Sequence, residues 1–114
     1  MQRFLLKSKI HKAMVTEANL HYIGSITIDE DLLKRTNIWP GERVQIVSNT
    51  SGNRIETYVI KGKRGSGIIC VNGACSHMIK RGEEIIIMAY TLSTSAIKPK
   101  CILVDKKNRF IKNL

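Results

Sequence analysis

The sequence predicts a single domain, residues 1–114, that is mainly β with one short helix. Several short segments alternate apolar and polar residues, which is typical of half-buried strands. Glycines with polar neighbours separate these segments and indicate tight turns. Because the turns follow one another so closely, we expect the strands to form a closed barrel, an arrangement that leaves no exposed sheet edge.

The expected strands are distributed over most of the chain. The first lies in 21–29, HYIGSITID, although a Gly-Ser pair interrupts its alternation. The others cover 43–48, 55–60, 67–72, 84–90 and 101–105. The segment 84–90, EIIIMAY, is an almost continuous apolar run, so we expect that strand to be buried on both faces.

The expected helix follows directly after the first of these strands. Asp29 is the expected N-cap, and the two acidic residues after it suit the positive end of the helix dipole. Lys34 and Arg35 suit the negative end, and Leu32 and Leu33 should pack inward. The sequence therefore predicts one short, capped helix between strands.

Metal and disulfide chemistry are not indicated. The three cysteines, Cys70, Cys75 and Cys101, include no CxxC pair, and their odd number suits a reducing compartment. The three histidines lack a metal-binding spacing such as HExxH. No apolar run is long enough for a signal peptide or a membrane span. We therefore expect a cytoplasmic protein that binds neither a metal nor a membrane.

The net charge of +10 allows nucleic-acid binding. Of the 19 Lys and Arg residues, 12 lie in 51–114, mostly in expected turns and near the C-terminal end. No aromatic residues alternate with them as platforms for stacking bases. A solvated basic surface explains this pattern better, and a small nucleic-acid-binding β-barrel remains the alternative function.

The Gly24-Ser25 pair offers a specific chemistry. A serine hydroxyl can attack the preceding carbonyl, and the resulting ester can eliminate to cut the chain and leave dehydroalanine. Hydrolysis of dehydroalanine then yields a pyruvoyl group. Glycine before the serine would supply unusual backbone angles and an open approach to the peptide bond. A Gly-Ser pair alone is far more often a simple turn.

The surrounding residues are more informative. The segment SKIHKAMVTEANLHYIGSITIDEDLL resembles the N-terminal signature of the bacterial, pyruvoyl-dependent aspartate 1-decarboxylase family. RIETYVI and ICVNGA are similar to its second and third motifs, and GEEIIIMAY and KPKCILVD to its later strands. The resemblance covers nearly the whole chain and implies a double-psi β-barrel assembled as a homotetramer, with active sites between subunits.

This resemblance also implies a role for individual residues. Cleavage after Gly24 would give fragments 1–24 and 25–114, and Ser25 would become the pyruvoyl group that forms a Schiff base with L-aspartate. Thr57 would assist cleavage, and Tyr58 would return a proton after CO2 leaves. The implied substrate-binding residues are Lys9, His11, Tyr22, Arg54, Thr57, Asn72, Gly73 and Ala74. The implied product is β-alanine for pantothenate and coenzyme A.

These residue types suit the chemistry that the resemblance implies. Decarboxylation leaves a carbanion, and a pyruvoyl group can accept its charge without pyridoxal phosphate. Arg54 can grip the retained carboxylate by two parallel contacts, and Tyr58 is a plausible proton donor. Lys9 and His11, two residues apart, would share one strand face.

Simpler interpretations remain beside these roles. Arg54 can be a solvated charge, and Thr57 and Tyr58 can be packing residues of a strand. Thr57 and Tyr58 should face opposite sides of a regular strand, so joint action requires a twist or two sites. The sequence also leaves open an unprocessed precursor, a maturation helper, and glutamate as the substrate. Cys75 follows the NGA segment where the family commonly has alanine.

Overall fold

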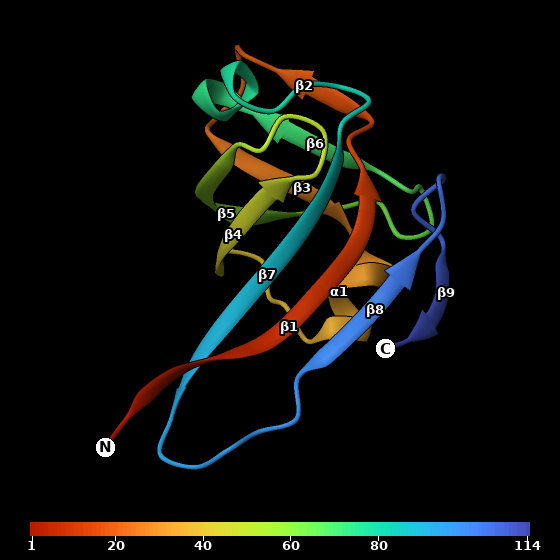
Figure 1. The fold of residues 1–114 in the computed structure, drawn as a ribbon. Coiled ribbons are helices and arrows are strands. Elements are labelled where there is room, and N and C mark those ends of the chain that lie inside the picture. Colours follow the sequence, from red (N-terminus) through yellow and green to blue (C-terminus); the bar gives the residue numbers. More distant parts are fainter.

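The computed structural model describes residues 1–114 as one curved sheet with a short α-helix packed beside it (Figure 1). Its elements in chain order are β1 (Arg3–Met14), β2 (Glu17–Asn19), β3 (Ser25–Asp29), α1 (Glu30–Thr36), β4 (Arg43–Ser48), β5 (Arg54–Gly62), β6 (Ile69–Asn72), the 3-10 helix η1 (Gly73–His77), β7 (Glu84–Ser93), β8 (Lys100–Val104) and β9 (Phe110–Asn113). The predicted mainly β class is therefore confirmed. No helix of the chain is long and apolar enough to cross a membrane.

All nine strands belong to one sheet in the order β2-β6-β3-β5-β4-β7-β1-β8-β9. The pairings repeat on both sides of the antiparallel pair β4–β7. Each side continues with an antiparallel pair, a parallel pair and another antiparallel pair, and the parallel pair β2–β6 extends one side only. This twofold repetition agrees with the double-psi β-barrel. Hydrogen bonds do not close the sheet into the expected ring, because β2 and β9 remain its two ends.

The interior is one cluster of 19 buried apolar residues, mostly isoleucine and valine, which are favoured in strands. Successive side chains of a strand point to opposite faces, so β7 buries Ile85, Ile87 and Ala89 while Ile86 and Met88 are only half-buried. The prediction that 84–90 is buried on both faces is therefore wrong for the single chain.

The predicted strand boundaries differ in accuracy. The strand 43–48 is confirmed as β4, and the other later strands are recovered within three residues at each end. The strand expected in 21–29 begins only at Ser25, because the preceding residues form an exposed turn between β2 and β3. Three strands have no predicted range: β1, the longest with 12 residues, and β2 and β9, which at three and four residues are too short for an alternation to reveal.

The predicted cap of α1 is confirmed. Asp29 Oδ1 accepts a hydrogen bond from the Asp31 backbone N–H at 2.9 Å, and Leu32 and Leu33 are buried. The same carboxylate accepts bonds from the N–H groups of Gly65 and Gly67, at 2.9 and 2.8 Å. Asp29 thus ties the C-terminal end of β3 to the turn before β6 and holds this strand in register.

Candidate functional site

Ser25 lies where an exposed turn enters the sheet. Tyr22 and Ile23 are 50% and 67% exposed, and Gly24 is also exposed, whereas Ser25 is 0% exposed. The Ser25 hydroxyl donates a hydrogen bond to the Ile23 carbonyl oxygen at 2.8 Å. The Gly24–Ser25 peptide bond therefore joins an accessible residue to a serine whose oxygen has a fixed orientation.

Asn72 holds the Ser25 oxygen from the neighbouring strand. The two residues lie directly opposite each other in the antiparallel pair β3–β6. Asn72 is 2% exposed, and its Nδ2 donates hydrogen bonds of 3.0 Å to Ser25 Oγ and to Thr27 Oγ1. Ser25 donates its one hydroxyl proton to Ile23, so its oxygen can take part in a further hydrogen bond only as the acceptor. The amide of Asn72 donates that bond.

Gly73 approaches the turn at Gly24 closely. Gly73 has a φ of +67°, and a Cβ atom added there would lie 2.6 Å from Gly24 Cα and 3.1 Å from the Tyr22 carbonyl oxygen. Only glycine fits this backbone conformation and this space without displacement. Gly73 is thus packed directly against the residue that precedes Ser25.

Gly24 itself differs from the prediction. Its φ lies outside the left-handed region, so the expected unusual backbone angle is not found at this residue. A Cβ atom on Gly24 would meet no other atom within 4 Å, so the space on the side-chain side of this residue is open. The glycine that requires a left-handed conformation at this site is Gly73.

β5 brings Tyr58 to the neighbourhood of Ser25. Ile26 pairs with Val59 in the parallel pair β3–β5, and both side chains are buried in the core. Extending this register back by one residue places Tyr58 beside Ser25, on the opposite, outer face of the sheet. Tyr58 is 38% exposed there. The two residues are therefore adjacent on neighbouring strands.

Arg54 and Thr57 take different positions on the same strand. Arg54 shares the outer face with Tyr58, and its Nη1 donates to Gln45 Oε1 at 3.0 Å. Thr57 is half-buried and points to the opposite face, since β4–β5 pairing is regular through Val44–Thr57. Of the two predicted alternatives, a local twist of the strand or two separate sites, the single chain agrees better with two separate sites for Thr57 and Tyr58.

Lys9 and His11 share one face of β1, as their spacing predicts, and both are half-buried. His11 Nδ1 is buried and has no hydrogen-bond partner. Burial lowers the pKa of His11, and the charges of Lys9 and Lys12 lower it further against the opposing effect of Glu84. The ring is therefore neutral near pH 7, with a nitrogen left for a bound molecule or a second chain to satisfy.

The chain does not bring all predicted site residues together. Gly24, Ser25, Asn72 and Gly73 are in contact, Tyr58 lies on the adjacent strand, and Tyr22 and Ala74 are exposed at the edge of this group. In the sheet, β5, β4 and β7 separate β3 from β1. Lys9 and His11 thus form a second group, on a strand that is not adjacent to Ser25.

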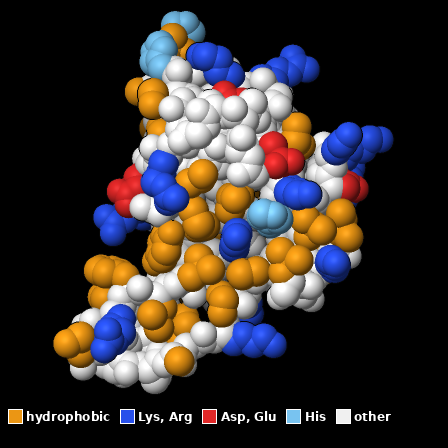
Figure 2. All heavy atoms as spheres, in the orientation of Figure 1, with side chains coloured by type: hydrophobic (Ala, Val, Ile, Leu, Met, Phe, Trp, Pro, Cys, Tyr) orange, Lys and Arg blue, Asp and Glu red, His pale blue; other side chains and the backbone are white.

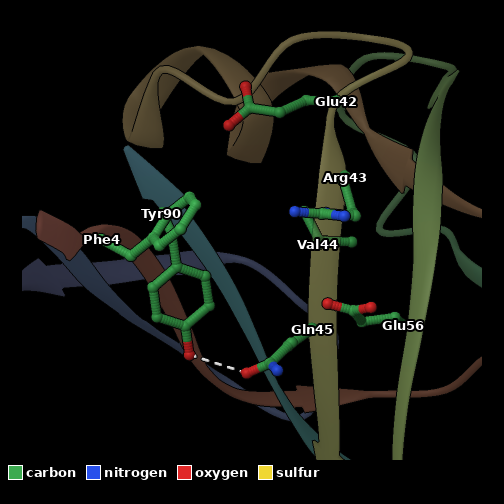
Figure 3. Close-up of a pocket in the computed structure, with 7 residues that line it drawn as sticks. All are labelled: Phe4, Glu42, Arg43, Val44, Gln45, Glu56 and Tyr90. Carbon is green, nitrogen blue, oxygen red and sulfur yellow. Dashed lines mark hydrogen bonds between the residues drawn. The ribbon is translucent and has the colours of Figure 1, made fainter. Parts of the chain in front are cut away.

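Three surface pockets lie away from the predicted site residues. One of them has a volume of about 480 Å³. Figure 3 shows the residues that line it, which are Phe4, Glu42, Arg43, Val44, Gln45, Glu56 and Tyr90. Tyr90 Oη donates to Gln45 Oε1 across it at 2.8 Å. This pocket and two others of about 440 Å³ contain none of the predicted site residues. Since Ser25 is fully buried, a substrate does not reach its side chain in the uncut chain.

Two residues of this site were not predicted from the sequence. They are Thr27 and Cys70, which lie opposite each other in the β3–β6 pair. Thr27 is two residues from Ser25, and Cys70 is two residues from Asn72. Cys70 Sγ donates to Asn72 Oδ1 at 3.2 Å. The signal is present as Ser-x-Thr and Cys-x-Asn, where polar residues recur at the period of two that places them on one strand face.

Comparisons with known proteins identify the family of the chain. The sequence profile of the family described as "Aspartate decarboxylase" matches residues 1–111. The aspartate 1-decarboxylase of Acetivibrio thermocellus is 54% identical over 111 residues, covering 94% of this chain and 88% of the relative. That of Desulfitobacterium hafniense is 52% identical, covering 98% and 91%, and that of Bacillus cereus is 49% identical, covering 100% and 93%.

A search of solved structures found the crystal structure of the rationally designed mkDPBB_sym1 protein. It has a TM-score of 0.49 and 12% sequence identity, and the match covers 76% of this chain and 96% of the designed chain.

Proposed function

Because this chain belongs to the aspartate decarboxylase family, we propose that it is a carboxy-lyase that converts L-aspartate to β-alanine and CO2. The β-alanine supplies pantothenate and coenzyme A synthesis. The observation that carries the proposal is the buried, oriented hydroxyl of Ser25 directly after an exposed Gly24, in a chain that matches this family over residues 1–111.

The first step of the proposal is self-cleavage at Gly24–Ser25. Ser25 Oγ attacks the Gly24 carbonyl carbon, the C–N bond breaks, and the amide becomes an ester with a free Ser25 amine. Removal of the Ser25 α-proton expels Gly24 as a carboxylate and leaves dehydroalanine at residue 25. Addition of water and loss of ammonia give the pyruvoyl group. Asn72 and Gly73 support this step by holding Ser25 Oγ and packing against Gly24. The proposal also gives Thr57 a part in cleavage, on the family resemblance alone, since in the single chain its side chain faces the other side of β5.

The pyruvoyl group supplies an electron sink for the carbanion that decarboxylation creates, as pyridoxal phosphate does in other enzymes. No pyridoxal phosphate and no metal take part in the proposal. The residues around Ser25 fit such a group, because Asn72 already donates to the oxygen at this position and Tyr58 lies on the adjacent strand. Cleavage would also free the buried Ser25 from the turn that covers it.

The chain's own residues bind and protonate the substrate. Arg54 holds the carboxylate that is retained, and its guanidinium is anchored by Gln45. Tyr58 donates a proton to the α-carbon after CO2 leaves. Lys9 and His11 add a positive charge and a neutral imidazole, and Tyr22, Thr57, Asn72, Gly73 and Ala74 complete the binding site.

The proposed assembly is a homotetramer with active sites between subunits. It is supported by the separation of the β1 group from Ser25 in the single chain. It is also supported by apolar residues on the surface, which gather along β1 and β7 in Figure 2. Phe4, Tyr90 and Leu92 are 70%, 38% and 51% exposed, a pattern typical of surfaces that contact other proteins.

The nucleic-acid-binding alternative is not favoured. Figure 2 shows Lys and Arg side chains scattered over the visible face without a continuous basic band. The proposal therefore includes no nucleic-acid and no membrane partner, and it places the enzyme in the cytoplasm.

Intact-mass analysis of the purified full chain tests this proposal. The expected result is two fragments, residues 1–24 and residues 25–114, with the second beginning in a pyruvoyl group. The same sample should release β-alanine from L-aspartate, and L-glutamate serves as the comparison substrate. Material that forms β-alanine while every chain is intact would contradict the pyruvoyl chemistry. An intact chain without activity points to a precursor that needs a maturation helper.

A further inference from the structure

Four polar side chains form a closed group on one face of the β3–β6 pair. Ser25 lies opposite Asn72, and Thr27 lies opposite Cys70. Because residues two apart in a strand share a face, all four point to the same side. Asn72 contacts each of the other three, at 3.0 Å to Ser25 Oγ, 3.0 Å to Thr27 Oγ1 and 3.2 Å to Cys70 Sγ.

The hydrogen bonds in this group run in one direction. Ser25 donates its proton to the Ile23 carbonyl, so its oxygen must accept from Asn72 rather than donate to it. The amide nitrogen of Asn72 therefore faces Ser25 and Thr27, and its oxygen faces Cys70. The Cys70 thiol is the donor to that oxygen. Cys70 is 5% exposed, so water does not readily replace it.

The thiol keeps its proton at neutral pH. Burial raises the pKa of Cys70, and the negative charge of Glu17 raises it further. A protonated thiol can donate, whereas a thiolate facing the amide oxygen would repel it. The site thus holds Cys70 in the form that the direction of the hydrogen bonds requires.

We propose that Cys70 is a positioning residue for self-cleavage, because its thiol holds the Asn72 amide with the nitrogen toward Ser25 Oγ. The inference rests on the proposed function, of which cleavage at Gly24–Ser25 is a part. The Ser25 oxygen has two lone pairs, and the Asn72 donor occupies one of them. The second is left to attack the Gly24 carbonyl carbon. Without the Cys70 donor, the Asn72 amide can rotate and present its Oδ1 to Ser25. The Ser25 hydroxyl would then donate to Asn72 Oδ1 instead of to the Ile23 carbonyl, and Ser25 Oγ would lose its orientation.

The test compares donor-free variants with a donor-retaining one. Cys70→Ala and Cys70→Val lack the donor and bracket the cysteine in volume, whereas Cys70→Ser keeps a donor of similar size. Each full chain is made by cell-free synthesis, and intact-mass measurements follow its conversion into fragments 1–24 and 25–114. We expect the first-order cleavage rate to fall about fivefold or more in the Ala and Val variants, the loss expected for one hydrogen bond. Cys70→Ser should stay within about twofold of the wild-type rate.

A packing role would give a different pattern. Thermal unfolding is measured for the same substitutions in an uncleavable Ser25→Ala chain, where the loss of sulfur should lower the midpoint in Cys70→Ser and Cys70→Ala alike. Cleavage rates that follow these midpoints, without rescue by serine, would overturn the positioning role. Wild-type rates in Cys70→Ala and Cys70→Val would overturn it as well. A wild-type chain that stays intact both alone and with a cell extract that could supply a maturation helper would instead refute the proposed function, before the variants are compared.

Discussion

The region around Ser25 and the face of β1 that carries Lys9 and His11 differ in one respect. They differ in how fully the single chain supplies hydrogen-bond partners for their buried polar atoms. Ser25 and Asn72 are buried, and their side-chain polar atoms have hydrogen-bond partners within the chain. Lys9 and His11 are half-buried, and His11 Nδ1 has no partner. A buried polar atom is normally hydrogen-bonded, so the β1 face is incomplete in the way that a binding surface is.

This difference separates two activities of the molecule. Of the residues proposed for cleavage, Ser25, Asn72 and Gly73 are in contact around Gly24 within one chain, so one chain can orient its own scissile bond, whereas Thr57 faces the other side of β5. The residues proposed for substrate binding are divided between nonadjacent strands. Substitutions of Ser25 and Gly73 should therefore change cleavage, whereas substitutions of Tyr58 and Arg54 should change catalysis and leave cleavage intact.

Ser25→Ala should have the largest effect, because it removes the oxygen that attacks Gly24. We expect a folded chain that stays intact and produces no β-alanine from L-aspartate. Intact mass and an activity assay measure the two results, and circular dichroism confirms the fold. Fragments or normal turnover from this variant would end the proposed role of Ser25.

Tyr58→Phe should cleave itself at the normal rate but decarboxylate L-aspartate slowly. This substitution therefore separates self-cleavage from decarboxylation. The loss of a positioned proton donor typically costs about 10²-fold or more in rate. Mass spectrometry should find the two fragments of the wild type, while kcat falls by roughly this factor. An unchanged kcat would remove Tyr58 from the proton-donor role.

Gly73→Ala should slow cleavage by about tenfold or more, because its Cβ would lie 2.6 Å from Gly24 Cα and would displace the turn before Ser25. Gly82→Ala is the matched control. Gly82 also has a left-handed φ, of +87°, but a Cβ there would meet no atom within 4 Å. Time courses of fragment formation compare the two. Equal rates in both variants would mean that close packing against Gly24 has no role in cleavage.

Arg54→Lys should raise the KM for L-aspartate by about tenfold and leave the cleavage rate unchanged. Lysine keeps the charge but cannot reproduce the two parallel contacts of a guanidinium with a carboxylate. Steady-state kinetics measure the effect on the fully matured variant. If KM stays at the wild-type value, Arg54 is a solvated surface charge, the simpler interpretation of its sequence context.

His11→Gln should have the smallest effect, a change in how stability depends on pH. The folded state lowers the pKa of His11 through burial and through Lys9 and Lys12. The unfolded chain therefore binds more protons as the pH falls through 6.5, the usual pKa of histidine, and stability decreases in that range. Thermal midpoints at pH 7.5 and 5.5, measured in the Ser25→Ala chain, should differ less after substitution. An equal difference in both chains would argue against this titration.

Local patterns were sufficient to predict much of the chain. The period of two located most strands, and Asp29 with the charges around α1 located the helix and its cap, because caps and alternation depend on neighbouring residues. The resemblance to the family pointed to Gly24-Ser25 and Asn72 directly. The limits of 21–29 and the burial of 84–90 were not predictable, since they depend on which segments pair with a strand and what covers it.

By itself the sequence determined the β class, the capped helix and the identity of the residues around Gly24-Ser25. Only the tertiary structure decided that Gly73, and not Gly24, needs a left-handed backbone, and that Cys70 and Thr27 join Ser25 and Asn72. These contacts link residues more than 40 positions apart, and the register between β3 and β6 sets them. Register is a property of the paired strands, so a segment taken alone does not contain it.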